Sequence, residues 1–166
     1  MGQFYPNYAV LQLRITKGLI EIIRVFRPIA LEEMLPATLR IAKEKLLMSK
    51  RVLVVLSCGT DNPNRATRAL FFAMLAHKKG KVVSVFLLDE AVYLAKRGIV
   101  EHLRAATGDS ADDHLHYLQE YGVSLLVCIP CAVTRQIAES DLIKGARMAK
   151  GDELIDLADD SSVLSF

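Results

Sequence analysis

The sequence predicts an α/β domain with a mainly parallel, five-stranded sheet, preceded by an α-helical N-terminal extension. From Lys50 onward, short apolar or β-branched runs alternate with amphipathic helical patterns, which is the order of parallel β-α-β crossovers. Gly, Asn and Pro residues separate these runs and mark where the elements start and stop. The chain is therefore expected to divide into an arm over 1–47 and an α/β domain over 48–166.

The arm over 1–47 shows two helical patterns. The first has apolar residues at spacings of three and four and ends before Pro28, and the second contains Pro36, which should kink or restart it. Charged residues interrupt every apolar window of spanning length, so we expect no transmembrane segment. A packing or oligomerisation arm is the favoured interpretation. Contact with a membrane surface stays open, as does an upstream translation ahead of a true start at Met48.

Five segments carry strand patterns. The first is a β-branched run followed by a turn rich in Gly, Asn and Pro, and the third is a continuous apolar run of the kind that is buried on both faces of a parallel sheet. The last would be an edge or an inner strand. In chain order the segments are 51–57, 81–88, 124–129, 146–148 and 163–166.

Helices are expected between these strands. Asn62 suits the cap of the first helix, Pro63 suits its first turn, and Gly80 should end it. A looser segment covers 99–110. The remaining helices are predicted over 89–98, over 112–121, from Cys131 onward, and over 152–158.

Composition and motifs exclude several function classes. A net charge of +2 without a basic cluster gives no nucleic-acid footprint. Three cysteines without evident pairing, and no secretory signal pattern, favour a reducing cytoplasm. One C-x-x-C lacks a second pair of metal ligands, and His114 and His116 do not share a helix face, so these histidines are expected to be solvated. With no G-x-G-x-x-G or P-loop pattern, we predict neither a metal nor a cofactor.

Two cysteines follow the third strand in a C-x-x-C spacing. Cys131 comes where a helical pattern begins, and the unpaired N–H groups and dipole of a helix start should ease formation of its thiolate. Arg135, one turn later, would add a positive field. Loops that follow parallel strands share one edge of the sheet. That edge should hold the site, with Cys128, Cys131 and Arg135 as its main residues and with four accessory candidates: Cys58, Asp61, Asp89 and Tyr93.

Several segments resemble the DsrE/DsrF-like, or YchN-like, family. They are 57–63, 89–98, the pattern V-C-x-x-C-x-x-x-R that ends at Arg135, and 163–166, so the likeness covers about 49–166. The resemblance implies a three-layer α/β/α fold of flavodoxin-like architecture, assembly as homotrimers or hexamers, and a sulfur relay in which Cys128 carries a persulfide. Cys131 matches a second cysteine of YchN-like members. The sequence departs at Gln136, where family members usually have glycine.

The predicted function is a cytoplasmic sulfur carrier with donor and acceptor proteins as partners, and sulfurtransferase activity is left open. The resemblance favours Cys128 as the carrier, whereas helix electrostatics favours Cys131. One alternative is a dithiol redox protein that uses the C-x-x-C pair. Another is a non-enzymatic, oligomeric module that binds a small molecule with Asp61, Asp89, Glu90 and Tyr93. Against this second alternative, Asp61 serves at least equally well as a turn former, and Glu90 as a helix-start charge, as either does as a ligand.

Overall fold

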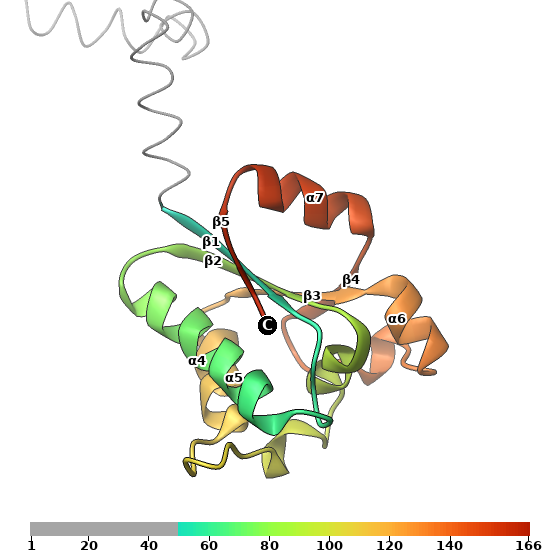
Figure 1. Cartoon of the computed structure of the whole chain (residues 1–166). Coiled ribbons are helices and arrows are strands. Elements are labelled where there is room, and N and C mark those ends of the chain that lie inside the picture. The colour runs from blue at the N-terminus through green and yellow to red at the C-terminus, as the bar shows by residue number, and fades with distance from the viewer. Residues whose placement is uncertain (1–49) are drawn as a thin grey trace, which may run out of the picture. The chain divides into compact units, whose positions relative to one another are not determined.

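A computed structural model of the chain describes residues 50–166, all of which belong to one compact unit (Figure 1). The predicted arm over 1–47 lies outside the described residues, so its helices, its role in assembly and its membrane contact stay predictions. Within residues 50–166, no helix is both long enough and apolar enough to cross a bilayer.

Five strands form one sheet in the order β4-β3-β2-β1-β5, and every neighbouring pair is parallel. The predicted five-stranded sheet is confirmed. The register pairs Leu56 with Leu87 and Leu87 with Val127, so β1, β2 and β3 end at the same edge. The strands are β1 (Arg51–Leu56), β2 (Val82–Leu87), β3 (Ser124–Cys128), β4 (Ala146–Ala149) and β5 (Ser162–Ser165).

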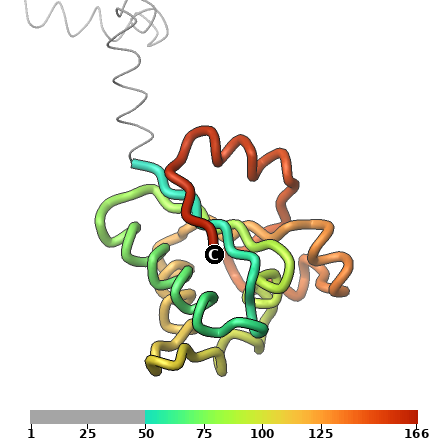
Figure 2. Tube along the Cα trace, in the orientation of Figure 1, coloured from blue at the N-terminus to red at the C-terminus, as the bar shows by residue number. Residues whose placement is uncertain are grey.

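Right-handed crossovers explain which face each helix covers. From β1 to β3 the chain moves in one direction through α4 (Pro63–Lys78) and α5 (Ala111–Glu120), which pack against each other on one face. The return to β5 runs the opposite way through α7 (Gly151–Asp159), which lies on the other face (Figure 2). The strand order differs from the 2-1-3-4-5 order of flavodoxin, so the likeness to flavodoxin concerns the layers alone.

The core lies between the sheet and the α4–α5 layer. Its largest fully buried side chains include Phe86 from β2, Leu70 from α4 and Leu115 from α5. By contrast, α7 has no buried residue and all four residues of β5 are exposed. The two helical layers are therefore unequal, and β5 is an edge strand.

The local signals at the start of α4 act as predicted. The Asn62 side chain accepts a hydrogen bond from the backbone N–H of Arg65 at 3.2 Å, and Pro63 occupies the first turn. Gly80 follows the helix with a φ of +75°, a conformation that glycine adopts without steric cost.

The segments between β2 and β3 differ from the prediction. The helix expected over 89–98 is the shorter 3₁₀ helix η1 (Asp89–Ala95), and the looser segment contains a second 3₁₀ turn, η2 (Val100–His102). Asp89 enters η1 with a φ of +44°, outside the right-handed helical region. In so short an apolar segment, sequence periodicity does not separate a 3₁₀ helix from an α-helix.

One histidine prediction is wrong. His116 is exposed as expected, but His114 is partly buried against Phe71, with 5.5 Å between ring centres, and its Nε2 is buried without a hydrogen-bond partner. Burial lowers the pKa of His114. The reason is the orientation of α5, because its packing against α4 turns His114 inward.

Candidate active site at the carboxyl edge of β3

The C-x-x-C segment lies where β3 ends and the short helix α6 (Ile129–Thr134) begins. Cys128 is the last residue of β3 and caps α6, and it is 7% exposed. Cys131 lies in the first turn of α6 and is partly exposed. Both are free thiols, and they lie close enough together that Cys128 affects the pKa of Cys131. Cys128 is therefore largely shielded from solvent, whereas Cys131 is partly accessible to it.

Asp89, which follows β2, faces Cys131. The Cys131 thiol donates to Asp89 Oδ1 at 3.6 Å, and the backbone N–H of Asp89 points to the Cys131 sulfur. Burial raises the pKa of Cys131, and the neighbouring Cys128 and the charge of Asp89 raise it further. Only the hydrogen bond from the Asp89 backbone N–H lowers this pKa. Cys131 therefore keeps its proton at neutral pH.

The direction of this pKa shift contradicts the expectation from helix electrostatics. A helix start was expected to lower the pKa of Cys131, but α6 has only six residues, so few peptide dipoles add up along it. Burial raises the pKa of Cys131 most, and the neighbouring Cys128 and then the Asp89 carboxylate raise it further.

Arg135 joins the cysteine loop to η1. It caps the carboxyl end of α6, donates from Nη1 to the Cys131 carbonyl oxygen at 3.2 Å, and donates from Nη2 to Glu90 Oε1 at 2.5 Å. Glu90 raises the pKa of Arg135 further above its usual value. Because Glu90 offsets its charge, Arg135 holds the loop in position more than it supplies the free positive field expected from the sequence.

The loop after β1 contains two of the accessory candidates. Asp61 Oδ1 accepts a hydrogen bond from the Gly59 N–H at 2.6 Å, so Asp61 forms the turn. Cys58 is buried, and that burial raises the pKa of its thiol, with Arg65 and Asp61 as the nearby charges. The charges that act on Cys58 are thus not those that act on Cys131.

Two features of the site escaped the sequence analysis. Glu90 was considered only as a helix-start charge or pocket residue, but it is the ion-pair partner of Arg135. A side chain at Gly59 would put its Cβ 2.4 Å from the Glu90 carbonyl oxygen, so only glycine allows the β1 loop to pack on η1. Such a close approach of two loops leaves no local signal beyond the glycine itself.

The structure brings one group of the predicted residues together. Cys128, Cys131, Asp89 and Arg135 are linked by contacts, and Tyr93 is close enough to act electrostatically on Arg135. Tyr93 also packs against the core. Within residues 50–166, no group of three or more His, Cys, Asp or Glu side chains is placed to hold a metal ion. The chemistry of this edge is therefore that of two thiols beside a carboxylate and a guanidinium.

Comparison with known proteins identifies the family. The model of the DsrE/DsrF-like family matches residues 50–166. The chain belongs to the DsrE/DsrF-like family. Among solved structures, this DsrE/DsrF-like fold is similar to the YchN protein of E. coli, with a TM-score of 0.60 and 23% identity over 72% of this chain and 100% of that one. The resemblance seen in the sequence is confirmed.

Two relatives of this DsrE/DsrF-like protein come from archaea. An uncharacterized protein of Methanopyrus kandleri is 30% identical over 118 residues, covering 69% of this chain and 92% of the relative. An uncharacterized protein of Methanocaldococcus jannaschii is 32% identical over 117 residues, covering 68% and 96%. The function must therefore be argued from the site.

Proposed function

We propose that this protein is a sulfur carrier that accepts a persulfide sulfur on Cys128 and passes it to an acceptor thiol. The proposal rests on a difference between the two thiols of the pair, since the surroundings of Cys131 favour its protonated form. The Cys131 thiol donates its one proton to the Asp89 carboxylate, and the neighbouring Cys128 also raises the pKa of Cys131, so both groups help to hold the proton on Cys131. With Cys131 held as a thiol, Cys128 is the sulfur of the pair that attacks. This argument favours the same residue as the family resemblance.

Loading and transfer are two thiol exchanges. The Cys128 thiolate attacks the outer sulfur of a donor persulfide, an S–S bond forms at Cys128, and the donor sulfur leaves as a thiolate. The terminal sulfur then lies about 2 Å beyond the Cys128 sulfur, which extends the reach of a side chain that is only 7% exposed. An acceptor thiolate attacks that terminal sulfur and releases Cys128 as a thiolate. Each step exchanges one S–S bond for another, so no oxidant is needed.

Cys131 provides a second reaction by which the loaded sulfur can leave Cys128. Once deprotonated, it can attack the inner sulfur of the Cys128 persulfide, which forms a Cys128–Cys131 disulfide and releases HS⁻. Its raised pKa makes this attack slow at neutral pH, so the loaded sulfur is protected until an acceptor arrives.

Intact-mass analysis after incubation with a persulfide donor tests the proposal. Wild type should gain about 32 Da per loaded thiol, Cys128→Ser should gain none, and Cys131→Ser should load and hold the sulfur for longer. Cys58→Ser is the matched control, because Cys58 is a buried thiol outside the pair, and it should load like wild type. A wild-type protein that takes up no sulfur would contradict the proposal.

A dithiol redox function is the second candidate, because the two free thiols of the C-x-x-C segment lie next to each other. It requires a Cys128–Cys131 disulfide with a reduction potential near that of the cytosolic glutathione pool, about −220 to −320 mV. Titration with a glutathione buffer measures this potential. A disulfide within that range, without any sulfur uptake, would favour the redox function over the carrier.

We also propose that the protein acts in the cytoplasm as a homo-oligomer, a trimer or a hexamer, with donor and acceptor proteins as transient partners. Exposed apolar residues on the edge strand β5 support assembly: Val163 is 46% exposed and Leu164 is 40% exposed. Three free thiols suit a reducing compartment.

A further inference from the structure

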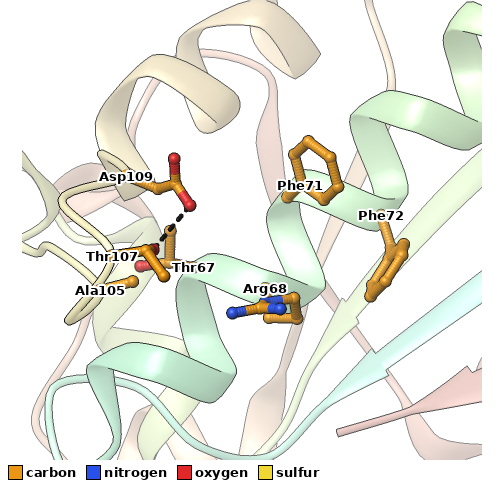
Figure 3. Close-up of a pocket in the computed structure, with 7 residues that line it drawn as sticks. All are labelled: Thr67, Arg68, Phe71, Phe72, Ala105, Thr107 and Asp109. Atoms are coloured by element: carbon orange, nitrogen blue, oxygen red, sulfur yellow. Dashed lines mark hydrogen bonds between the residues drawn. The ribbon is translucent and has the colours of Figure 1, made fainter.

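A cavity lies between α4 and the loop over 104–110, on residues that the cysteine site does not use. Its volume is about 250 Å3. In Figure 3, Thr67, Thr107 and Asp109 gather on one side of it, and the rings of Phe71 and Phe72 lie on the other. Arg68 extends between the two groups. The cavity thus combines opposite charges, hydroxyl groups and an apolar wall.

Thr67 gives the first sign that the cavity takes a ligand. This residue is 2% exposed and lines the cavity, yet its Oγ1 has no hydrogen-bond partner. Buried side-chain polar atoms nearly always have a partner, because an unpaired hydroxyl loses its bonds to water without replacement. Among residues 50–166, the one other such side-chain atom is His114 Nε2, whose ring packs against Phe71 of the cavity wall. Thr67 Oγ1 is therefore the unsatisfied atom of a cavity-lining residue, whereas His114 lies behind the Phe71 ring and does not line the cavity.

The loop that closes the cavity is held in place without a ligand. A β-bridge joins Arg104 to Ser110, and the Ala105 N–H donates to the Asp109 carbonyl oxygen at 3.0 Å. The Ala106 N–H donates to Asn64 Oδ1 at 2.6 Å, which ties the loop to the first turn of α4. A site fixed in this way needs little ordering when a ligand binds.

The charges of the cavity indicate the class of ligand. The Arg68 guanidinium is exposed and makes no ion pair or hydrogen bond with any other residue of 50–166. Asp109 uses Oδ2 to accept from the Thr107 hydroxyl at 2.7 Å, and its Oδ1 has no such bond within the same residues. A guanidinium suits a carboxylate, and a carboxylate suits an ammonium group. The rings of Phe71 and Phe72 suit an apolar side chain.

We propose that this cavity binds a small zwitterion of the apolar α-amino acid class. Arg68 pairs with the ligand carboxylate, Asp109 pairs with its ammonium group, and the Thr67 hydroxyl gains its missing partner. A volume of about 250 Å3 is slightly below the range of about 300 to 1,000 Å3 that is usual for ligand pockets, which suits a small molecule of this class.

Isothermal titration calorimetry of the full chain with L-leucine tests the ligand class. Two analogues separate the charges: isocaproate lacks the ammonium group and isoamylamine lacks the carboxylate. L-leucine should bind saturably and at least about tenfold more tightly than either analogue, because a hydrogen-bonded charge is lost in each. Absence of saturable leucine binding would overturn the proposal, and equally tight binding of isocaproate would overturn the zwitterion.

Variants locate the binding in this cavity. Arg68→Gln should weaken leucine binding at least about tenfold, and Thr67→Val should weaken it several-fold while keeping the side-chain shape. Arg104→Gln is the control, since Arg104 is an exposed arginine on the same loop that does not line the cavity, and it should bind like wild type. Thermal unfolding of each variant checks the fold. Unchanged affinity in folded Arg68→Gln would overturn the site.

Discussion

At the scale of single residues, the reactivity of the site depends on the proton of Cys131. The Asp89 carboxylate accepts a hydrogen bond from this thiol, and its charge is one of the causes that raise the Cys131 pKa. The folded protein holds this proton more tightly than the unfolded chain does. The resulting stability is complete below the ordinary thiol pKa of 9.0 and is lost as the pH rises through the folded value.

Asp89→Asn tests this electrostatic link. Asparagine tolerates the positive φ of this position and keeps the backbone N–H, but it removes the negative charge. The pKa of Cys131 should fall, so its alkylation by iodoacetamide should begin at a lower pH, as followed by peptide mass. Asp61→Asn is the control, because Asp61 acts on Cys58 and should leave the Cys131 profile unchanged. An unshifted profile in Asp89→Asn would contradict the assigned cause.

Gln136 occupies the position where the family resemblance led us to expect glycine, and its backbone explains the preference. Its φ is +53°, which costs an L-residue about 1 to 2 kcal/mol relative to the right-handed conformation. Glycine avoids that cost but loses more chain entropy on folding, about 0.4 to 1 kcal/mol. The side chain of Gln136 is exposed.

Gln136→Gly should therefore raise the free energy of unfolding by about 0.5 to 1 kcal/mol, measured by urea denaturation. Gln136→Ala keeps the strained φ and shortens the same side chain, so it should give no comparable gain. Equal stability of the glycine and alanine variants would show that the backbone conformation is not the cause.

At the scale of elements, one side chain joins α6 to η1. Arg135 contacts both the Cys131 carbonyl oxygen and Glu90, so the position of the C-x-x-C loop depends on a residue of the neighbouring loop. The Arg135 side chain is 19% exposed and that of Glu90 42% exposed, so solvent screens the pair. Its importance lies in geometry, since thiol exchange needs the attacking sulfur in line with the S–S bond.

Arg135→Gln should slow persulfide loading of Cys128 by up to about tenfold with little effect on stability, as measured by the time course of intact mass. Arg135→Lys keeps the charge but lacks the planar guanidinium group that contacts both the Cys131 carbonyl oxygen and Glu90. It should therefore restore the loading rate only in part. Arg147→Gln removes an ion pair with Glu153 near α7 and should load at the wild-type rate. Wild-type loading by Arg135→Gln would exclude a positioning role.

At the scale of the whole α/β domain, the two faces of the sheet are covered unequally. Two helices and the main core cover one face, whereas α7 on the other face has only partly buried residues against the core and β5 is exposed throughout. The exposed side chains of β5 are apolar at Val163 and Leu164. An isolated domain with such an edge strand is open to pairing with another chain.

Leu164→Lys should lower the mass of the assembly in analytical ultracentrifugation, because a charge at an apolar contact opposes association. Its effect on the fold should be small, since Leu164 is 40% exposed. Val82→Lys is the control, a substitution at an even more exposed apolar residue on the first position of β2. An unchanged mass for Leu164→Lys would remove β5 from the proposed interface.

The order and type of most elements follow from the sequence because their signals are local. The strands are short apolar runs bounded by turn residues, and Asn62 and Pro63 mark the start of α4 through a side-chain cap and a fixed φ. The edge of the sheet that holds Cys128 and Cys131 follows as well, because parallel strands must place their following loops together.

What only the tertiary structure decided is how charges and burial combine at that edge. The partner of Arg135, the inward turn of His114 and the raised pKa of Cys131 all depend on residues that are distant in the chain. The sequence alone suggested a more acidic Cys131 because a helix start is a local feature. The structure reverses this because the helix is short and because the fold buries the thiol, next to Cys128 and a carboxylate from the loop after β2.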